Sequence, residues 1–247
     1  MNNINDIGII WKDEEICEST NSEVYNLCNK IKAPCVVTSK QQTKGRGRRG
    51  HTWISENGNL FMSMAFQAKA QDLSRLVIIS GIAVMQTVKH FCPSVDIKLK
   101  WPNDVLVGGG KISGILFERG PYDFWIMGVG INVVSHPDLG VSGYATAGLN
   151  ALGAKTDRIA VLKKFIANWN TLLYIYRQEG FTLLKQIWIN NAYNLNKPIV
   201  IQQENNNKSG IFAGIDDNGC LLLKNGQMIE TVIAGDMFVA PKEEKDE

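Results

Sequence analysis

Two long helix patterns, separated by short strand patterns, constrain the fold of this chain more than any other feature. Leu73–Phe91 has the composition of a long, mostly buried helix that stops near Pro93. Asp157–Glu179 carries its apolar residues on one broad helical face. Asn59–Gln67 instead alternates apolar and other residues, which is typical of a half-buried strand. The sequence therefore predicts a chain built from both helices and strands.

Several shorter elements are predicted in the same way. Helical spacing over Glu23–Ile31 follows a run of N-cap residues at Ser19–Ser22. Strands are expected where β-branched or alternating residues cluster, at Ile7–Ile16, Val36–Thr38, Ile97–Trp101, Val105–Val107, Lys111–Glu118 and Trp125–Val134.

The pattern of apolar residues and turn residues changes near Pro198. From there to Pro241, short alternating runs are separated by turn signals such as Asn225-Gly226. About 45 residues of small strands indicate a minor β-barrel domain, because closing a barrel removes exposed strand edges. We therefore expect a larger domain over residues 1–195 and a small β-barrel over residues 196–247.

Composition excludes several classes of protein. The chain has 247 residues, of which 45% are hydrophobic and 20% charged, as in an ordinary globular protein. A net charge of +2 argues against a dedicated nucleic-acid binder. No apolar stretch is long enough to cross a membrane, and Met1–Ile10 is not a secretory signal. Five scattered cysteines without a CxxC pair favour the reduced cytoplasm, with a catalytic cysteine left as an alternative.

The segment Gln42–Trp53 places three arginines among three glycines and ends in a tryptophan. Glycine lets the backbone approach an anion closely, and the arginine guanidinium matches phosphate oxygens. This glycine-arginine loop therefore suits a phosphorylated, multiply charged ligand. Arg-Gly segments also occur in nucleic-acid-binding tails, so the loop is informative only together with other motifs.

Four other motifs accompany this loop in a fixed order. They are STN at Ser19–Asn21, KWPNDV at Lys100–Val105, GKISGIL at Gly110–Leu116 and GVGINV at Gly128–Val133. Together with GRGRRG at Gly45–Gly50, the ordered set resembles the biotin protein ligases. The resemblance covers nearly the whole chain, since Gly214–Leu223 is similar to that family's C-terminal β-barrel.

The resemblance implies a fold and a reaction. The fold would be α/β, with a mixed-sheet catalytic domain like the class II synthetases and a small C-terminal SH3-like β-barrel. The enzyme would join biotin and ATP, accompanied by Mg²⁺, into biotinoyl-5′-AMP and pyrophosphate, without a resident metal site. It would then transfer biotin to a lysine of the biotin carboxyl carrier domain of acetyl-CoA carboxylase or a related carboxylase.

Members that also repress transcription carry a DNA-binding domain before the STN motif. Only 18 residues precede Ser19 here, so we expect a ligase that binds neither nucleic acid nor membrane. The family includes monomers and homodimers, and both stay open. Lipoate–protein ligase and octanoyltransferase share the superfamily fold and are the nearest alternatives, although no cysteine lies in a recognisable catalytic motif.

The resemblance assigns roles to particular residues. Lys111 would stabilise the charge that develops between the biotin carboxylate and the α-phosphate, and Arg48 would clamp phosphate. Asp104 would deprotonate or orient the incoming lysine, a choice that stays open. Biotin binding falls on Ser19, Thr20, Asn21, Gln42, Gly45, Arg46, Gly47, Arg48, Lys111, Gly114 and Gly130. ATP or adenylate binding falls on Arg46, Arg48, Trp53, Asn103, Lys111 and Asn132.

Simpler interpretations accompany these assignments. STN alone is a helix cap, Trp53 alone is a core residue, and Asn103-Asp104 alone is a turn. Lys100 suits a structural or supporting role. The chain departs from the family pattern at His51, at Gly108–Gly110 and at Gly235-Asp236. A second loop over Ser135–Gly148 matches only loosely, and we expect the glycine-arginine loop to become ordered when ligand binds.

Overall fold

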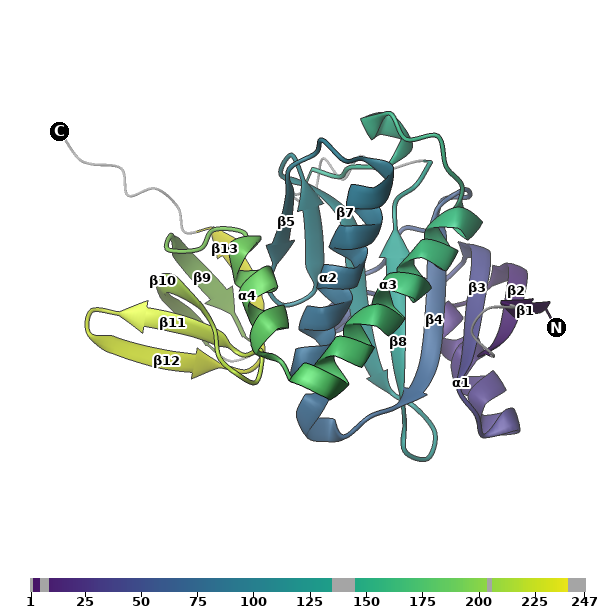
Figure 1. The fold of residues 1–247 in the computed structure, drawn as a ribbon, viewed down its shortest axis with the longest axis horizontal. Coiled ribbons are helices and arrows are strands. Elements are labelled where there is room, and N and C mark those ends of the chain that lie inside the picture. Colours follow the sequence, from purple (N-terminus) through teal and green to yellow (C-terminus); the bar gives the residue numbers. More distant parts are fainter. Residues whose placement is uncertain (1, 5–8, 135–144, 204–205, 240–247) are drawn as a thin grey trace.

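Eight strands form the main sheet of the computed structural model, which describes residues 2–4, 9–134, 145–203 and 206–239 (Figure 1). The strand order is β1-β2-β3-β4-β8-β7-β6-β5. Only the β2–β3 pair is parallel among the ladders of these described residues, so the sheet is mixed. The strands are β1 (Asn2–Ile4), β2 (Ile9–Cys17), β3 (Cys35–Gln42), β4 (Leu60–Gln67), β5 (Ile97–Lys100), β6 (Asp104–Val107), β7 (Gly110–Arg119) and β8 (Phe124–Ile131).

Helices cover the two faces of this sheet unequally. The helices are α1 (Thr20–Ile31), α2 (Leu73–Phe91), α3 (Arg158–Glu179) and α4 (Thr182–Asn190), with short 3₁₀ turns at Arg48–Gly50, Ala70–Asp72 and Asn150–Leu152. In Figure 1, α2 and α3 lie side by side across one face of the sheet. Helix α1 packs on the other face through a separate core with β3, β4 and β8. None of the described helices is both long and apolar enough to span a bilayer.

Sequence periodicity predicts the long elements well. Helix α2 has the predicted bounds, and α3 begins one residue later than predicted, after Asp157 caps it. Helix α1 begins at Thr20, three residues before the predicted start, because extended backbone ends at Ser19. The sequence did not indicate α4 or β1. Helix α4 has nine residues and buries only Leu184 and Trp188, too few to define a period.

The small C-terminal sheet contains five antiparallel strands in the order β12-β11-β10-β9-β13. They are β9 (Pro198–Gln202), β10 (Asn207–Ile215), β11 (Leu221–Asn225), β12 (Met228–Val232) and β13 (Asp236–Val239). The last strand therefore pairs with the first, which confirms the expected small β-domain. Strands β12 and β13 are its edges, and no ladder joins them in the part of the chain that the structure describes.

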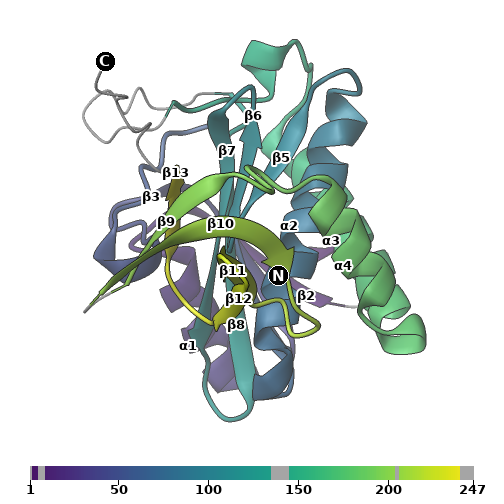
Figure 2. The same ribbon diagram turned by 90° about the vertical axis from the view of Figure 1, so that its left-hand side faces the viewer.

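Aromatic residues attach the small sheet to the rest of the chain. Trp188 of α4 packs edge-to-face on Phe212, with ring centroids 6.3 Å apart. The Trp101 indole N–H donates to the Gly219 carbonyl at 3.1 Å, and Trp101 is only 2% exposed. Figure 2 shows the small sheet in front of the edge of the main sheet formed by β5, β6 and β7. The small sheet is thus placed beside the KWPNDV segment.

A polar network fixes the start of α3 to β2 and β3. Both Asp13 carboxylate oxygens accept from the Arg158 guanidinium, at 2.8 and 2.6 Å, and the Thr38 hydroxyl donates to Asp13 at 2.6 Å. Burial acts to raise the pKa of Asp13, but the hydrogen bonds from Arg158 and Thr38 outweigh it and lower this pKa. Because the pKa of Asp13 is lower in the folded state than in the unfolded state, the ionised carboxylate stabilises the fold at pH values above the unfolded-state pKa. This stabilisation is lost as the pH falls through the folded-state pKa.

Replacing Asp13 with asparagine should lower the free energy of unfolding by about 2 kcal/mol at pH 7, because a charged, doubly hydrogen-bonded pair is lost. The difference from wild type should shrink as the pH falls below about 4, where the unfolded-state carboxyl protonates first. Urea unfolding at pH 7, 5 and 3.5 measures this. A difference that is constant over the three pH values would contradict the network's electrostatic role.

Candidate active site

A cavity of about 420 Å³ lies on the α1 face of the main sheet, beneath the glycine-arginine loop. This volume is typical of small-ligand sites. Its lining comes from the start of α1, the loop, strands β3 to β8 of the main sheet, and strands β9 and β13 of the small sheet. The cavity thus brings together all five sequence motifs.

Glycines form the floor of this cavity. Gly114 of β7 and Gly130 of β8 are paired across the ladder, and the Trp53 indole lies on them. A Cβ added at Gly114 would come within 2.8 Å of Trp53 Cζ3, and one at Gly130 within 2.5 Å of Trp53 Cε2. A Cβ at Gly128 would collide with the Asn21 side chain. Only glycine lets these side chains approach the sheet so closely.

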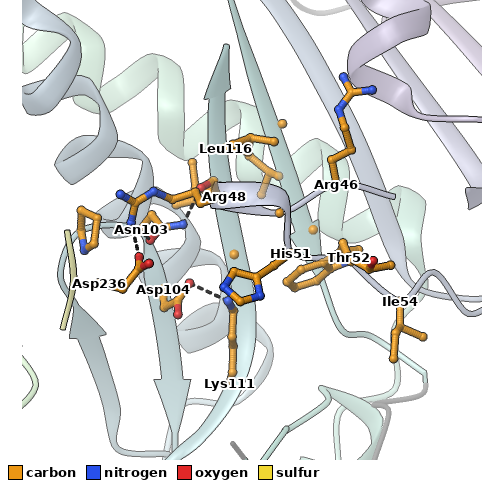
Figure 3. A pocket seen from close by; sticks show the side chains of 18 of the residues that line it. Arg46, Arg48, His51, Thr52, Ile54, Asn103, Asp104, Lys111, Leu116 and Asp236 are labelled. Atoms are coloured by element: carbon orange, nitrogen blue, oxygen red, sulfur yellow. Dashed lines mark hydrogen bonds and ion pairs between the residues drawn. The ribbon is translucent and has the colours of Figure 1, made fainter. Parts of the chain in front are cut away.

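A β-bulge directs Lys111 into the cavity. Val105 pairs with Ser113 and Leu106 with Lys111, so Ile112 is an extra residue on β7. Without it, the alternation of the strand would put Lys111 and Gly114 on opposite faces. With it, the Lys111 ammonium lies 2.7 Å from Asp104 Oδ1 (Figure 3). It also lies 5.4 Å from the centroid of the Trp53 ring. Asp104 and Lys111 therefore face the same space.

Polar side chains form a buried network at one end. The Thr20 backbone N–H and hydroxyl both donate to Gln42 Oε1, at 2.8 and 3.1 Å, and the Gln42 amide donates to Ser55. The Ser63 hydroxyl lies within hydrogen-bond distance of Thr20 Oγ1 and of Asn21 Oδ1. Ser19 caps α1 without a side-chain hydrogen bond to the helix. The STN motif is therefore a helix start and a cavity wall together.

Cations and carboxylates gather at the other end. Arg48 donates to Asp236 at 2.9 Å and to the side-chain Oδ1 of Asn103 at 3.2 Å (Figure 3). It also donates to the Gly235 backbone carbonyl at 3.3 Å. Burial lowers the pKa of the Arg48 guanidinium, and the charge of Asp236 opposes this effect. Asn103 is held in turn, since its amide donates to the Ile115 carbonyl at 2.7 Å.

Lys100 adds a third cation to this end. It is only 8% exposed, and burial lowers the pKa of its ammonium while Asp104 partly opposes the shift. Three cations, Arg48, Lys100 and Lys111, thus face two carboxylates, Asp104 and Asp236. The excess positive charge in a partly buried space favours an anionic ligand.

Arg46 takes a different direction from Arg48. Its guanidinium donates to the Ser22 hydroxyl and to Glu118, both at 3.0 Å. Figure 3 shows it on the opposite side of the loop from Asn103 and Asp236. Gly45 does not belong to the cavity lining in the described residues, because it packs against the Trp53 carbonyl and the Ser55 hydroxyl. Gly45 therefore lies outside the cavity although a ligand contact was predicted for it. Arg46 lines the cavity, but its guanidinium points away from the Arg48 end.

Asn132 supports the strand that carries Lys111. Its side-chain amide donates to the Lys111 carbonyl at 3.3 Å and to the Ala147 carbonyl at 3.0 Å. The Lys111 and Ala147 backbones are also joined, with the Ala147 N–H donating to Lys111 at 3.0 Å. Both hydrogens of the Asn132 side-chain amide are used, so the side-chain oxygen Oδ1 is the atom that can accept a hydrogen bond from a ligand. Residues 135–144 of the loosely matching second loop lie outside the described residues.

Apart from Gly45, each residue assigned to ligand binding or catalysis lines this cavity. Sequence reasoning missed the apolar wall, for which alternation in β4, β7 and β8 was the available signal. It gave no binding role to the small sheet or to Lys100 and Trp101, since contacts between distant segments leave no local pattern. The unassigned lining residues are His51, Thr52, Ile54, Phe61, Met62, Lys100, Trp101, Pro102, Ile115, Leu116, Gly128, Val129, Thr146, Gln202, Asp236, Met237 and Phe238.

The five cysteines are buried, and none lines the cavity in the described structure. Burial raises the pKa of the Cys35 thiol to about 12, which keeps it protonated and unreactive. The described residues hold no cluster of three or more histidine, cysteine or acidic side chains that suits a metal ion. This chemistry disfavours a cysteine nucleophile, which an octanoyltransferase would need.

The fold and the cavity define a class first: a mixed α/β domain with a small β-domain, built to bring an anionic ligand against a lysine. Sequence patterns then match two known families. Residues 15–132 match the biotin/lipoate A/B protein ligase family, and residues 195–239 match the biotin protein ligase C terminal domain. The chain belongs to the biotin protein ligases of this family.

Relatives and solved structures agree. The biotin–[acetyl-CoA-carboxylase] ligase of Paracoccus denitrificans is 31% identical over 235 residues, covering 90% of this chain and 97% of that protein. The bifunctional ligase/repressor BirA of Bacillus subtilis is 30% identical, covering 90% of this chain and 72% of its own length. The biotin protein ligase of Aquifex aeolicus in complex with biotin and ATP superposes with a TM-score of 0.82 at 25% identity, covering 93% and 97% of the two chains.

Proposed function

We propose that this protein is an ATP-dependent biotin protein ligase whose chemistry takes place in the cavity around Lys111. One observation carries the proposal: a buried polar network around Thr20 and Asn21 and a cationic group around Lys111 occupy two ends of the same cavity. Such a cavity can hold a neutral polar head at one end and a carboxylate beside phosphates at the other.

The first step forms a mixed anhydride. A biotin carboxylate oxygen attacks the α-phosphorus of ATP, the bond from that phosphorus to the β-phosphate oxygen breaks, and pyrophosphate leaves with its electron pair. Like charges meet in this step, so cations must neutralise and align them. Lys111 would neutralise the carboxylate and α-phosphate, and Arg48 would neutralise the phosphates; their position at the cationic end of the cavity supports these roles.

The second step transfers biotin to a protein. The neutral amine of an acceptor lysine attacks the carbonyl carbon of biotinoyl-AMP, AMP leaves, and the amine gives up a proton. Asp104 is the carboxylate nearest to Lys111 and can orient the incoming amine or accept that proton. Mg²⁺ would arrive with ATP and neutralise phosphate charge. Asp104 and Asp236, which pair with Lys111 and Arg48 in this structure, are the carboxylates that would hold such an ion, since it needs only one or two protein ligands.

We infer the acceptor from the relatives. We propose the biotin carboxyl carrier domain of acetyl-CoA carboxylase or a related carboxylase, modified in the cytoplasm by a monomeric or homodimeric enzyme. The names of the Paracoccus denitrificans and Mycobacterium tuberculosis relatives support this acceptor. The net charge of +2 supports an enzyme that does not bind nucleic acid. Residues 1–195 and 196–247 would be its two domains.

Pyrophosphate release upon mixing the protein with Mg-ATP tests the proposal, with biotin, lipoate and octanoate compared at equal concentration. We expect release only with biotin, followed by transfer of biotin to an added carrier domain. Release with lipoate instead would move the protein to the sister branch of the family. No release with any of the three acids would contradict an acid-activating function.

A further inference from the structure

Glu118 joins two parts of the molecule that the proposed mechanism treats separately. It lies on β7, on the same face as Gly114 and Leu116, but outside the lining of the main cavity. Its Oε2 atom accepts from the Asn21 side-chain amide at 2.6 Å and from the Arg46 guanidinium at 3.0 Å. One carboxylate oxygen therefore contacts both the start of α1 and the glycine-arginine loop.

The Asn21 amide is held at both ends. Its Oδ1 lies against the Ser63 hydroxyl and directly above the Gly128 α-carbon, and its Nδ2 donates to Glu118. Asn21 is only 5% exposed, so water cannot readily replace these partners. Without Glu118, the amide could turn by half a rotation and exchange its donor for its acceptor, because the two ends have nearly the same shape.

We propose that Glu118 is a positioning residue for the biotin head: it sets the direction of the Asn21 amide and keeps Arg46 beside it. This inference rests on the proposed function. A urea-type head carries both N–H donors and a carbonyl acceptor, so the orientation of Asn21 decides which of them it can satisfy. A wrongly turned amide leaves a buried polar group unpaired, which costs more than the loss of an exposed contact.

The two contacts of Glu118 should contribute unequally. The Arg46–Glu118 ion pair is half-exposed, and such pairs contribute little free energy. The Asn21 contact is more deeply buried and directly next to the cavity. Glu118→Gln retains an oxygen acceptor for Asn21 but loses the charge that holds Arg46, whereas Glu118→Ala loses both. The difference between these two variants isolates the Asn21 contact.

Steady-state pyrophosphate release measures the effect, with KM for biotin and KM for ATP determined separately. Glu118→Ala should raise KM for biotin about tenfold, the range expected for one hydrogen bond to a charged acceptor. Glu118→Gln should raise it about two- to threefold, and KM for ATP should stay within twofold in both. Glu15→Ala is the matched control, because it removes an ion pair with Lys40 on β2 and β3 outside the cavity lining.

An unchanged KM for biotin in Glu118→Ala would overturn the proposal. Equal rises in both KM values, accompanied by a lower Tm, would also overturn it by indicating a general structural role. The side-chain amide signals of Asn21 in ¹⁵N NMR, assigned with Asn21→Ala, give a readout independent of activity. They should move in Glu118→Ala and stay near the wild-type position in Glu118→Gln; signals unchanged in Glu118→Ala would contradict the contact even if wild type failed to use biotin.

Discussion

Replacing Lys111 with alanine is expected to reduce biotin-dependent pyrophosphate release by about 10²–10³-fold, the usual cost of removing one group that stabilises transition-state charge. The bulge at Ile112 brings the Lys111 ammonium to 2.7 Å from Asp104, inside the cavity. Once the ammonium is gone, an anionic carboxylate and phosphate at this place would meet the Asp104 carboxylate without the cation that pairs with it. Single-turnover release at saturating biotin and ATP measures the change.

The fold should survive this substitution. Lys111 is partly exposed, and its backbone hydrogen bonds to Ala145 and Ala147 do not involve the side chain. Lys98→Ala is the control, because Lys98 lies on β5 of the same sheet and pairs with Asp96 rather than lining the cavity. We expect wild-type activity from Lys98→Ala and similar Tm values for both variants. Comparable activity in the two would remove Lys111 from the mechanism.

Local sequence patterns predicted the elements that are long enough to show a period. The nineteen residues of α2 and the twenty-two of α3 contain several turns each, so the apolar face is evident. Helix α4 follows α3 directly after Gly180 and has only nine residues, which is too short for the same test. The small β-domain was predicted from turn signals. Its packing against Trp188 of α4 was not predicted, because it depends on contacts between residues that are distant in the sequence.

The residues of the site were also predicted only in part. The ordered motifs indicated Lys111, Asp104 and Arg48, since each lies within a recognisable stretch of sequence. They could not indicate that Asp236 meets Arg48, because 188 positions separate the two residues. Glu118 was equally hidden, since a glutamate in a strand gives no sign that it contacts Asn21 at the start of α1. Such contacts follow from register and from the bulge, which sequence periodicity alone does not specify.

Arg48→Ala is expected to let biotinoyl-AMP escape before transfer, raising the labelling of bystander proteins roughly tenfold to hundredfold relative to the carrier domain. Charge-assisted hydrogen bonds from a guanidinium to phosphate are among the stronger contacts that a protein makes. Arg48 also fastens the glycine-arginine loop to the small sheet through Asp236 and the Gly235 carbonyl. Its loss therefore removes both a phosphate partner and a restraint on the loop that covers the cavity.

Arg49 supplies a matched control within the same loop. It also pairs with Asp236, at 3.3 Å, and donates to the Gln202 carbonyl at 2.7 Å, yet it does not line the cavity in the described structure. If Arg48 acts by holding the adenylate, Arg49→Ala should leak far less than Arg48→Ala, although both weaken the link to the small sheet. Equal leakage from the two variants would instead mean that fastening the loop, rather than phosphate contact, retains the intermediate. Quantifying biotin on the carrier domain and on added serum albumin in one reaction separates these outcomes.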